Sequence, residues 1–185
     1  MVDFATRTLP LSGVHGGSPV VRIELAAPAE RISLRGAAAD VAALSAALGV
    51  DLPTKPKTSA SGNDRTALWL GPDEWLVIDS GTIVRNGMVA DAGNSGVPHS
   101  AADVSHRNTA ILVSGSGAAA TINTGCPQDL SLTAFPVGAC SRTVFGKVEI
   151  VLLRTAEDAF RVEVWRSFSD YAFGLLAEGA RDAAL

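Results

Sequence analysis

Charged side chains are scarce in this 185-residue chain, because Asp, Glu, Lys and Arg together make up only 18% of it, against about 25% in an average soluble protein. Hydrophobic residues make up 47%. Apolar surface in this excess has to be buried, and burial against other subunits is the simplest explanation. A high alanine content contributes to the same percentage, so that alternative stays open.

Runs of basic residues are also missing. The chain has 15 Lys and Arg against 19 Asp and Glu, a formal net charge of -4 and a pI of about 5.3, and its arginines are scattered singly. A protein that binds nucleic acid needs a basic patch or stripe, so this class of partner is excluded.

Long hydrophobic runs are absent as well. The first residues, Met1-Val-Asp-Phe4, lack the basic and apolar segments of a secretion signal. The longest alanine-rich stretch, residues 37–48, is much shorter than the roughly 20 residues that cross a membrane. We therefore expect a cytoplasmic protein without a membrane partner.

Cysteine and histidine, two common metal ligands, are few. Cys126 and Cys140 form no Cys-x-x-Cys pair and have no histidine at ligand spacing, so we expect reduced, buried thiols. His15 and His99 stand alone in loops. We therefore expect no metal site.

The clearest local pattern is a hairpin over residues 66–78, where two apolar runs flank a Gly-Pro-Asp turn. With Pro72-Asp73 as the loop, Leu70 faces Trp75 across the hairpin, and Trp69 points to the opposite face. An aromatic side chain on each face indicates that one face lies on the core and the other under another part of the chain or a partner. Trp69 and Trp75 are therefore our two candidates for an interface tryptophan.

Hydrophobic spacing predicts the remaining elements. Alternation predicts strands over residues 20–25, 31–35, 109–113, 142–154 and 160–166, with a short strand at 82–85 as a further option. Spacings of three and four predict helices over residues 37–48 and 117–124 and a final helix from Ser169. Residues 52–64 and 81–102 are rich in Gly, Pro and Ser and are predicted to be loops.

A unit of strand, helix and hairpin thus occurs twice, and a helix follows. This order predicts an α+β fold with a mixed, mainly antiparallel sheet rather than a doubly wound parallel sheet. Residues 1–19 contain two prolines and three glycines with little periodicity, so we expect an extended arm there. Residues 20–185 are expected to form a single domain.

The segment Gly115-Ser-Gly-Ala-Ala-Ala120 formally matches the dinucleotide-binding pattern GxGxxA. We reject this function because no acidic residue follows about 20 positions later to bind a ribose, and because the next strand belongs to a hairpin. The segment indicates a glycine-bounded turn from strand to helix, and we predict no cofactor-binding residue.

Ser105 and His106 place a hydroxyl next to a base, but neighbours in a strand point to opposite sides, so they do not form part of a triad. His106 and Arg107 are candidates for contact with an anion or a partner chain, or are simply polar residues at a strand end. Asp73 and Glu74 are interpreted as turn formers rather than catalytic carboxylates. We predict no catalytic residue.

Several rare sequence words occur in one order along the chain. They are Leu70-Gly-Pro-Asp-Glu-Trp-Leu76, Asp103-Val-Ser-His-Arg-Asn108, Asp129-Leu-Ser131, Phe135-Pro-Val-Gly138 with Arg142-Thr143, and Val164-Trp-Arg-Ser-Phe168. With these words the chain resembles the gamma-subunit family of heterotetrameric sarcosine oxidases over roughly residues 30–180. The block from Asp103 is similar, more distantly, to the folate-binding aminomethyltransferases of the glycine cleavage system, which implies the fold of their N-terminal domain.

The resemblance implies a non-catalytic structural subunit of an oxidoreductase complex. That complex oxidatively demethylates sarcosine to glycine and forms hydrogen peroxide and 5,10-methylenetetrahydrofolate. The implied partners are the alpha, beta and delta subunits, which hold FAD, FMN, NAD, zinc and tetrahydrofolate. A stand-alone folate-binding or aminomethyltransferase-like protein is the alternative, although Gly146-Lys-Val-Glu149 lacks the paired aspartates expected of a folate-facing turn.

Overall fold

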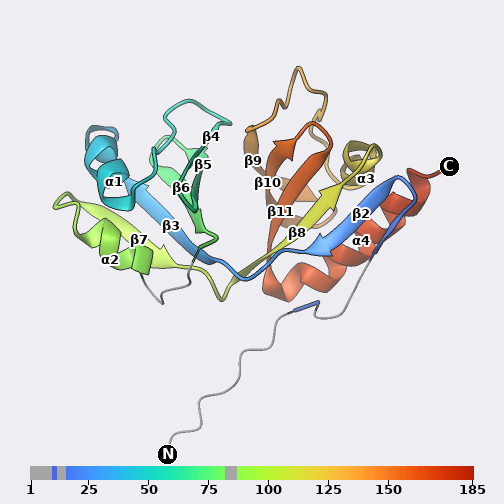
Figure 1. Cartoon of the computed structure of the whole chain (residues 1–185), viewed down its shortest axis with the longest axis horizontal. Helices are drawn as coiled ribbons and strands as arrows, with labels where there is room; N and C mark the ends of the chain where they lie inside the picture. The colour runs from blue at the N-terminus through green and yellow to red at the C-terminus, as the bar shows by residue number, and fades with distance from the viewer. Residues whose placement is uncertain (1–9, 12–15, 82–86) are drawn as a thin grey trace, which may run out of the picture.

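The computed structural model describes residues 10–11, 16–81 and 87–185, which form two antiparallel sheets with four α-helices (Figure 1). In spatial order, the larger sheet consists of β1 (Gly16–Ser18), β2 (Val21–Leu25), β8 (Asn108–Ser114), β11 (Ala159–Trp165), β10 (Val148–Ala156) and β9 (Cys140–Phe145). The smaller sheet consists of β4 (Ser59–Gly62), β5 (Arg65–Gly71), β6 (Glu74–Asp79), β3 (Glu30–Gly36) and β7 (His99–Asp103). The predicted α+β class and mainly antiparallel pairing are confirmed.

Each sheet is covered by helices on one face. Helix α1 (Val41–Leu48), which follows a 3-10 turn, and α2 (Gly87–Gly93) pack on the five-stranded sheet. Helices α3 (Ala118–Asn123) and α4 (Ser169–Asp182) pack on the six-stranded sheet. Among the helices of the described residues, none combines the length and the apolar character needed to cross a membrane.

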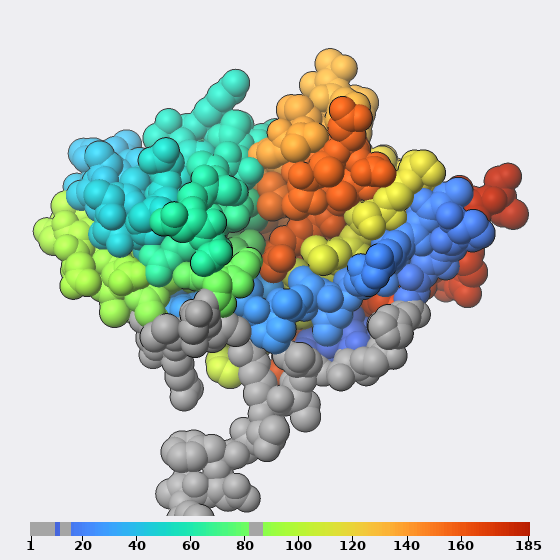
Figure 2. All heavy atoms as spheres, in the orientation of Figure 1, coloured from blue at the N-terminus to red at the C-terminus, as the bar shows by residue number. Residues whose placement is uncertain are grey.

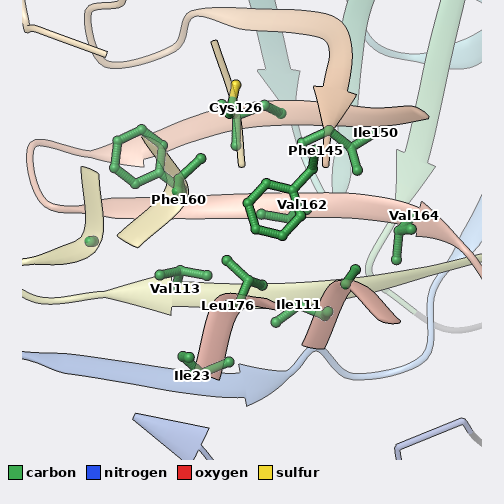
Figure 3. Close-up of a cluster of buried hydrophobic side chains, with 14 of the residues drawn as sticks. Ile23, Ile111, Val113, Cys126, Phe145, Ile150, Phe160, Val162, Val164 and Leu176 are labelled. Atoms are coloured by element: carbon green, nitrogen blue, oxygen red, sulfur yellow. The ribbon is translucent and has the colours of Figure 1, made fainter. Parts of the chain in front are cut away.

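The core of the six-stranded half follows from strand alternation. On β11, Phe160, Val162 and Val164 are buried on the side that faces the helices, and Leu176 of α4 packs against the same cluster (Figure 3). Side chains two residues apart in a strand share a face, which is why the predicted apolar faces of residues 148–152 and 160–164 are found as expected.

The two sheets also share an interior. The chain passes between them where β2 leads to β3 and where β7 leads to β8 (Figure 1). Leu68 and Leu76 of the smaller sheet pack in one buried cluster with Val151 and Leu153 of the larger sheet. The space-filling view shows the two halves in contact along this seam (Figure 2). Each sheet is therefore covered by helices on one face and, in part, by the other sheet on the opposite face.

The single strand predicted over residues 142–154 is wrong, because the chain turns back at Gly146 and forms two paired strands, β9 and β10. Gly146 has a φ of +58°, and a Cβ there would collide with the Tyr171 hydroxyl. In the sequence, Val144 continues the apolar alternation of Val148 and Ile150, but in the structure Val144 is exposed and Phe145, paired with Val148, is buried instead. The hydrophobic pattern therefore does not indicate the turn between β9 and β10, and the glycine is the local signal for it.

Three elements lie in segments that were predicted to be loops. Strand β4 consists of Ser, Ala and Gly and gains its place by pairing with β5 rather than through apolar alternation. Helix α2 buries only Met88 and Ala92, and β7 contains mostly small residues. The optional strand at residues 82–85 lies outside the described residues. Of the predicted arm, residues 16–18 form β1, which pairs with β2, and most of the rest also lies outside the described residues.

Candidate functional site

The two tryptophans of the hairpin do not lie as predicted. A β-bulge between Trp69 and Gly71 places Trp69, rather than Leu70, opposite Trp75, so both indoles extend from the same side of the sheet. Trp75 is 1% exposed, and its indole N–H donates to the carbonyl of Pro53 at 2.7 Å. Trp75 is thus a core residue of the smaller half and offers no surface to a partner. Trp69 is half-buried.

The word Asp103-Val-Ser-His-Arg-Asn108 forms the turn that carries the chain from β7 to β8. The Ser105 hydroxyl is buried and accepts the backbone N–H of Arg31 at 2.8 Å, and the Ser105 N–H donates to Asp103 Oδ1 at 2.8 Å. His106 and Arg107 are exposed on the outside of the same turn. Ser105 therefore tethers the turn to β3, and it diverges from His106 as expected.

Arg107 lies over an exposed aromatic pair. Its guanidinium carbon is 5.1 Å from the centroid of the Trp165 ring, a distance typical of a cation–π contact, and its Nε donates to Asn108 Oδ1 at 3.2 Å. Trp165 stacks on Phe168 with ring centroids 6.1 Å apart. Trp165 and Phe168 are each 41% exposed. These two aromatics were not predicted as interface residues, although the word Val164-Trp-Arg-Ser-Phe168 contains them.

The seam between the sheets holds a small polar pocket of about 30 Å³, which Arg107, Arg142, Glu149 and Trp165 line together with Leu70. Small-molecule sites usually measure roughly 300–1,000 Å³. The pocket is therefore large enough for about one water molecule and not for a pteridine or a similar substrate.

Glu74 is the centre of an ion-pair network beside this pocket, which it adjoins through Arg142. It begins β6 and pairs with Arg142 of β9, on the other sheet, and with Arg35 of β3 at 2.9 Å. The hydrogen bond from Arg142 is the main reason why the pKa of the Glu74 carboxyl is lowered. Arg142 also lies 3.9 Å from Glu149. Glu74 is thus a largely buried link between the sheets rather than only a turn residue, whereas Asp73 stays exposed in the turn.

A second ion pair crosses the seam at greater depth. Arg31 of β3 donates from Nε to Glu163 Oε2 of β11 at 2.7 Å, and both side chains are almost fully buried. Arg31 also donates to the carbonyl of Ala29 at 2.9 Å, and Glu163 accepts a second bond from Arg161 at 2.8 Å. These bonds satisfy the two buried charges and fix the position of one sheet against the other.

The glycine-rich segment at residues 115–120 has no room for a dinucleotide. Gly115 has a φ of +114°, and a Cβ there would collide with the carbonyl oxygen of Val20. The N–H of Gly117 donates to that same carbonyl at 3.1 Å. The turn between β1 and β2 thus occupies the place where a pyrophosphate would bind, so the segment is a packing feature.

Both cysteines are free, buried thiols, as predicted. Burial raises the pKa of the Cys140 thiol to about 11, and its Sγ lies 3.2 Å from the carbonyl of Thr58, to which it donates. A thiol of that pKa is protonated at neutral pH and unreactive. In the part of the chain that the structure describes, no three metal-ligating side chains gather in one place.

Comparison with known proteins identifies the family. The model of the sarcosine oxidase gamma subunit family matches residues 35–182, which is most of the chain. The chain belongs to this family. The sarcosine oxidase subunit gamma of an Arthrobacter species is 37% identical over 123 residues, which cover 65% of this chain and 60% of the relative. The match therefore spans less than two thirds of that relative's length. The subunit gamma of Corynebacterium sp. strain P-1 is 31% identical, with 77% of this chain and 70% of the relative covered.

Solved structures agree with the family and with the predicted fold. A chain of the heterotetrameric sarcosine oxidase from Corynebacterium sp. U-96 matches with a TM-score of 0.82 and 25% identity, covering 89% of this chain and 86% of that one. The glycine cleavage system aminomethyltransferase T of Bartonella henselae matches with a TM-score of 0.61 and 16% identity, covering 88% of this chain and 49% of that one. The second likeness establishes a shared fold and confirms the aminomethyltransferase-like architecture.

Proposed function

We propose that this chain is a structural, non-catalytic subunit of a heterotetrameric sarcosine oxidase. Membership of the gamma subunit family is the observation that carries the proposal. The geometry supports it, since the carboxylates of Glu74 and Glu163 at the seam are occupied by ion pairs with Arg142 and Arg31, and the pocket beside them measures only about 30 Å³. Side chains held in this way stabilise one arrangement of the two sheets, which suits a rigid building block.

In this proposal the assembly as a whole performs the chemistry. It oxidatively demethylates sarcosine to glycine and forms hydrogen peroxide and 5,10-methylenetetrahydrofolate, in the cytoplasm and as part of sarcosine catabolism. The alpha, beta and delta subunits are the partners and hold FAD, FMN, NAD, zinc and tetrahydrofolate. The gamma chain contributes an interface, for which Trp69, His106 and Arg107 remain our candidates.

The alternative is a stand-alone folate-binding or aminomethyltransferase-like protein, since the chain has the fold of an aminomethyltransferase domain. That likeness alone does not extend to activity. The two readings differ in what the isolated chain should bind, which allows a direct test.

The test compares the chain alone with the chain co-expressed with the other three subunits. We expect it to co-purify with a yellow flavin-containing complex, and we expect the isolated chain to show no rise in unfolding temperature with tetrahydrofolate. A folate-binding protein at about a hundredfold excess over Kd would instead gain about 2.7 kcal/mol of stability. A soluble monomer that binds tetrahydrofolate and ignores the other subunits would overturn the proposal in favour of the alternative.

A further inference from the structure

We infer that Arg107, Trp165 and Phe168 form a contact surface for a carboxylate-bearing segment of a partner subunit. The inference rests on the proposed function, because it assumes that partner subunits exist. Beyond the proposed function, the inference assigns Trp165 and Phe168 to the same surface as Arg107 and states the chemistry of the partner segment that binds there.

The aromatic part of this surface is exposed, although the backbone of Trp165 is paired within the sheet. Trp165 ends β11 and pairs with Asn108 of β8, on the face of the sheet that is turned toward the seam. Two residues earlier on that face, Glu163 is buried beneath the smaller sheet, whereas Trp165 lies at the edge of the seam and remains 41% exposed. Tryptophan at such a position is typical of the residues that dominate binding energy at protein interfaces.

The cationic part of the surface has an unused binding capacity. Within the described residues, no carboxylate oxygen lies within 4.0 Å of the Arg107 guanidinium. Two acidic side chains line the pocket together with Arg107. Glu149 lies 3.9 Å from Arg142, and Glu163 is paired with Arg31 and Arg161. Toward the described residues, the side chain of Arg107 donates from Nε, so its two terminal amino groups are left to donate to a ligand. A pair of parallel N–H donors fits a carboxylate in a bidentate manner.

The surface is held in place before any partner binds. The Asn108 Oδ1 accepts a hydrogen bond from the Nε of Arg107, and the Trp165 ring packs against one side of the guanidinium. In addition, the Arg166 N–H donates to the Arg107 carbonyl at 2.7 Å. The cation and the ring are thereby tied to each other through both backbone and side chain. Little side-chain entropy remains to be lost on binding, which favours affinity.

These features together specify the partner. Because no carboxylate of the described residues lies within 4.0 Å of Arg107, an acidic group suits this cation. The two exposed rings beside it call for apolar atoms that cover them. The partner segment is therefore one in which an aspartate or glutamate stands next to an apolar side chain. The carboxylate pairs with Arg107, and the apolar side chain lies on Trp165 and Phe168.

The experiment measures how firmly the chain is held in the four-subunit complex. The chain is co-expressed with its tagged partner subunits as wild type and as Arg107→Ala, Arg107→Lys and Trp165→Ala, and its dissociation is followed at low and at high salt. Arg22→Ala is the matched control, because Arg22 is an exposed arginine that already pairs with Glu24. The unfolding temperature of each isolated variant shows whether it folds.

We expect Arg107→Ala and Trp165→Ala to weaken assembly by about tenfold to a hundredfold, and Arg22→Ala to have no effect. Arg107→Lys keeps the charge but loses the planar fork, so a loss of about tenfold is expected. Wild-type binding should weaken with salt, and binding of Arg107→Ala should do so less.

Two outcomes would overturn the inference. Variants at Arg107 and Trp165 that assemble like the wild type would show that this surface is not a contact. If Trp165→Ala alone weakened assembly, and Arg107→Ala showed the same salt dependence as the wild type, a carboxylate partner for Arg107 would be excluded. If Trp165→Ala fails to fold, the two Arg107 variants decide the matter. A wild-type chain that never joins the complex would instead refute the proposed function.

Discussion

Beneath the six-stranded sheet, Phe145, Phe160 and Leu176 pack in a large apolar cluster, whereas the seam between the sheets places two ion pairs beside its apolar residues. Apolar burial is strong but has no direction. Paired charges with several hydrogen bonds hold only in one geometry, and a buried charge that loses its partner is costly. The comparison indicates that apolar packing stabilises each half, and that the ion pairs set how the halves lie against each other.

The largest effect should follow from damage to the apolar core. Phe145 is fully buried, so Phe145→Ala should lower the free energy of unfolding by about 4 kcal/mol. Val144→Ala is the matched control, because this neighbour on β9 is 48% exposed, and it should change stability by less than about 0.5 kcal/mol. Urea denaturation measures both. Similar losses in the two variants would mean that the faces of β9 are misassigned.

At the seam, Arg31→Ala should lower the free energy of unfolding by about 3 kcal/mol, because it leaves the Glu163 carboxylate buried without Arg31. The exposed Arg22–Glu24 pair provides the control, and Arg22→Ala should cost at most about 1 kcal/mol. If the two arginine variants lost equal stability in urea, the deep ion pair would have no special role in joining the sheets.

The outer ion pair should make stability depend on pH. The folded pKa of Glu74 lies below its unfolded value because of Arg142, so its contribution is present above about pH 4.3 and is lost as the pH falls through the folded pKa. Glu74→Gln should therefore cost about 1 kcal/mol at pH 7 and should converge with the wild type in acid. Glu149→Gln, at an exposed and longer pair, should follow the wild-type curve. Unfolding temperatures across the acid range decide between these results.

The smallest effect is a gain in stability. Glu30 is buried and burial raises the pKa of its carboxyl, while its Oε1 accepts the N–H of Met88 at 3.1 Å. The stability that the protonated Glu30 carboxyl contributes is thus fully present below the pKa of this group in the unfolded chain, and it is lost as the pH rises through the pKa in the folded chain. Glu30→Gln keeps an acceptor and removes the charge, so at pH 7 it should add about 0.5 kcal/mol. If thermal unfolding showed that Glu30→Gln is less stable than the wild type, the negative charge of Glu30 would be required to hold α2 in place.

Strands with clear alternation were predictable because their burial pattern is local. The strand over residues 20–25, the helix that ends at Gly49 and the apolar face of β11 all lie where the spacing places them. Elements of small residues, such as β4 and β7, were missed because a neighbouring strand, and not their own side chains, determines their conformation. The bulge at Trp69 was missed for a similar reason, since a register shift by one residue leaves the composition of the hairpin unchanged.

The candidate site was predictable only in part. His106 and Arg107 stood out as polar residues at a strand end, but Trp165 and Phe168 are separated from them by more than fifty residues of chain. Their proximity depends on the antiparallel pairing of β8 with β11, which no local pattern encodes.

By itself, the sequence determined the class of the fold, the faces of its main strands, the free thiols and the family, because each of these depends on residue types at short range. Tertiary structure alone decided that Glu74 and Glu163 join two sheets, that Trp75 is a core residue and that Arg107 meets an exposed tryptophan. Those contacts link residues that are far apart in the chain, and their geometry arises only when the two sheets pack together.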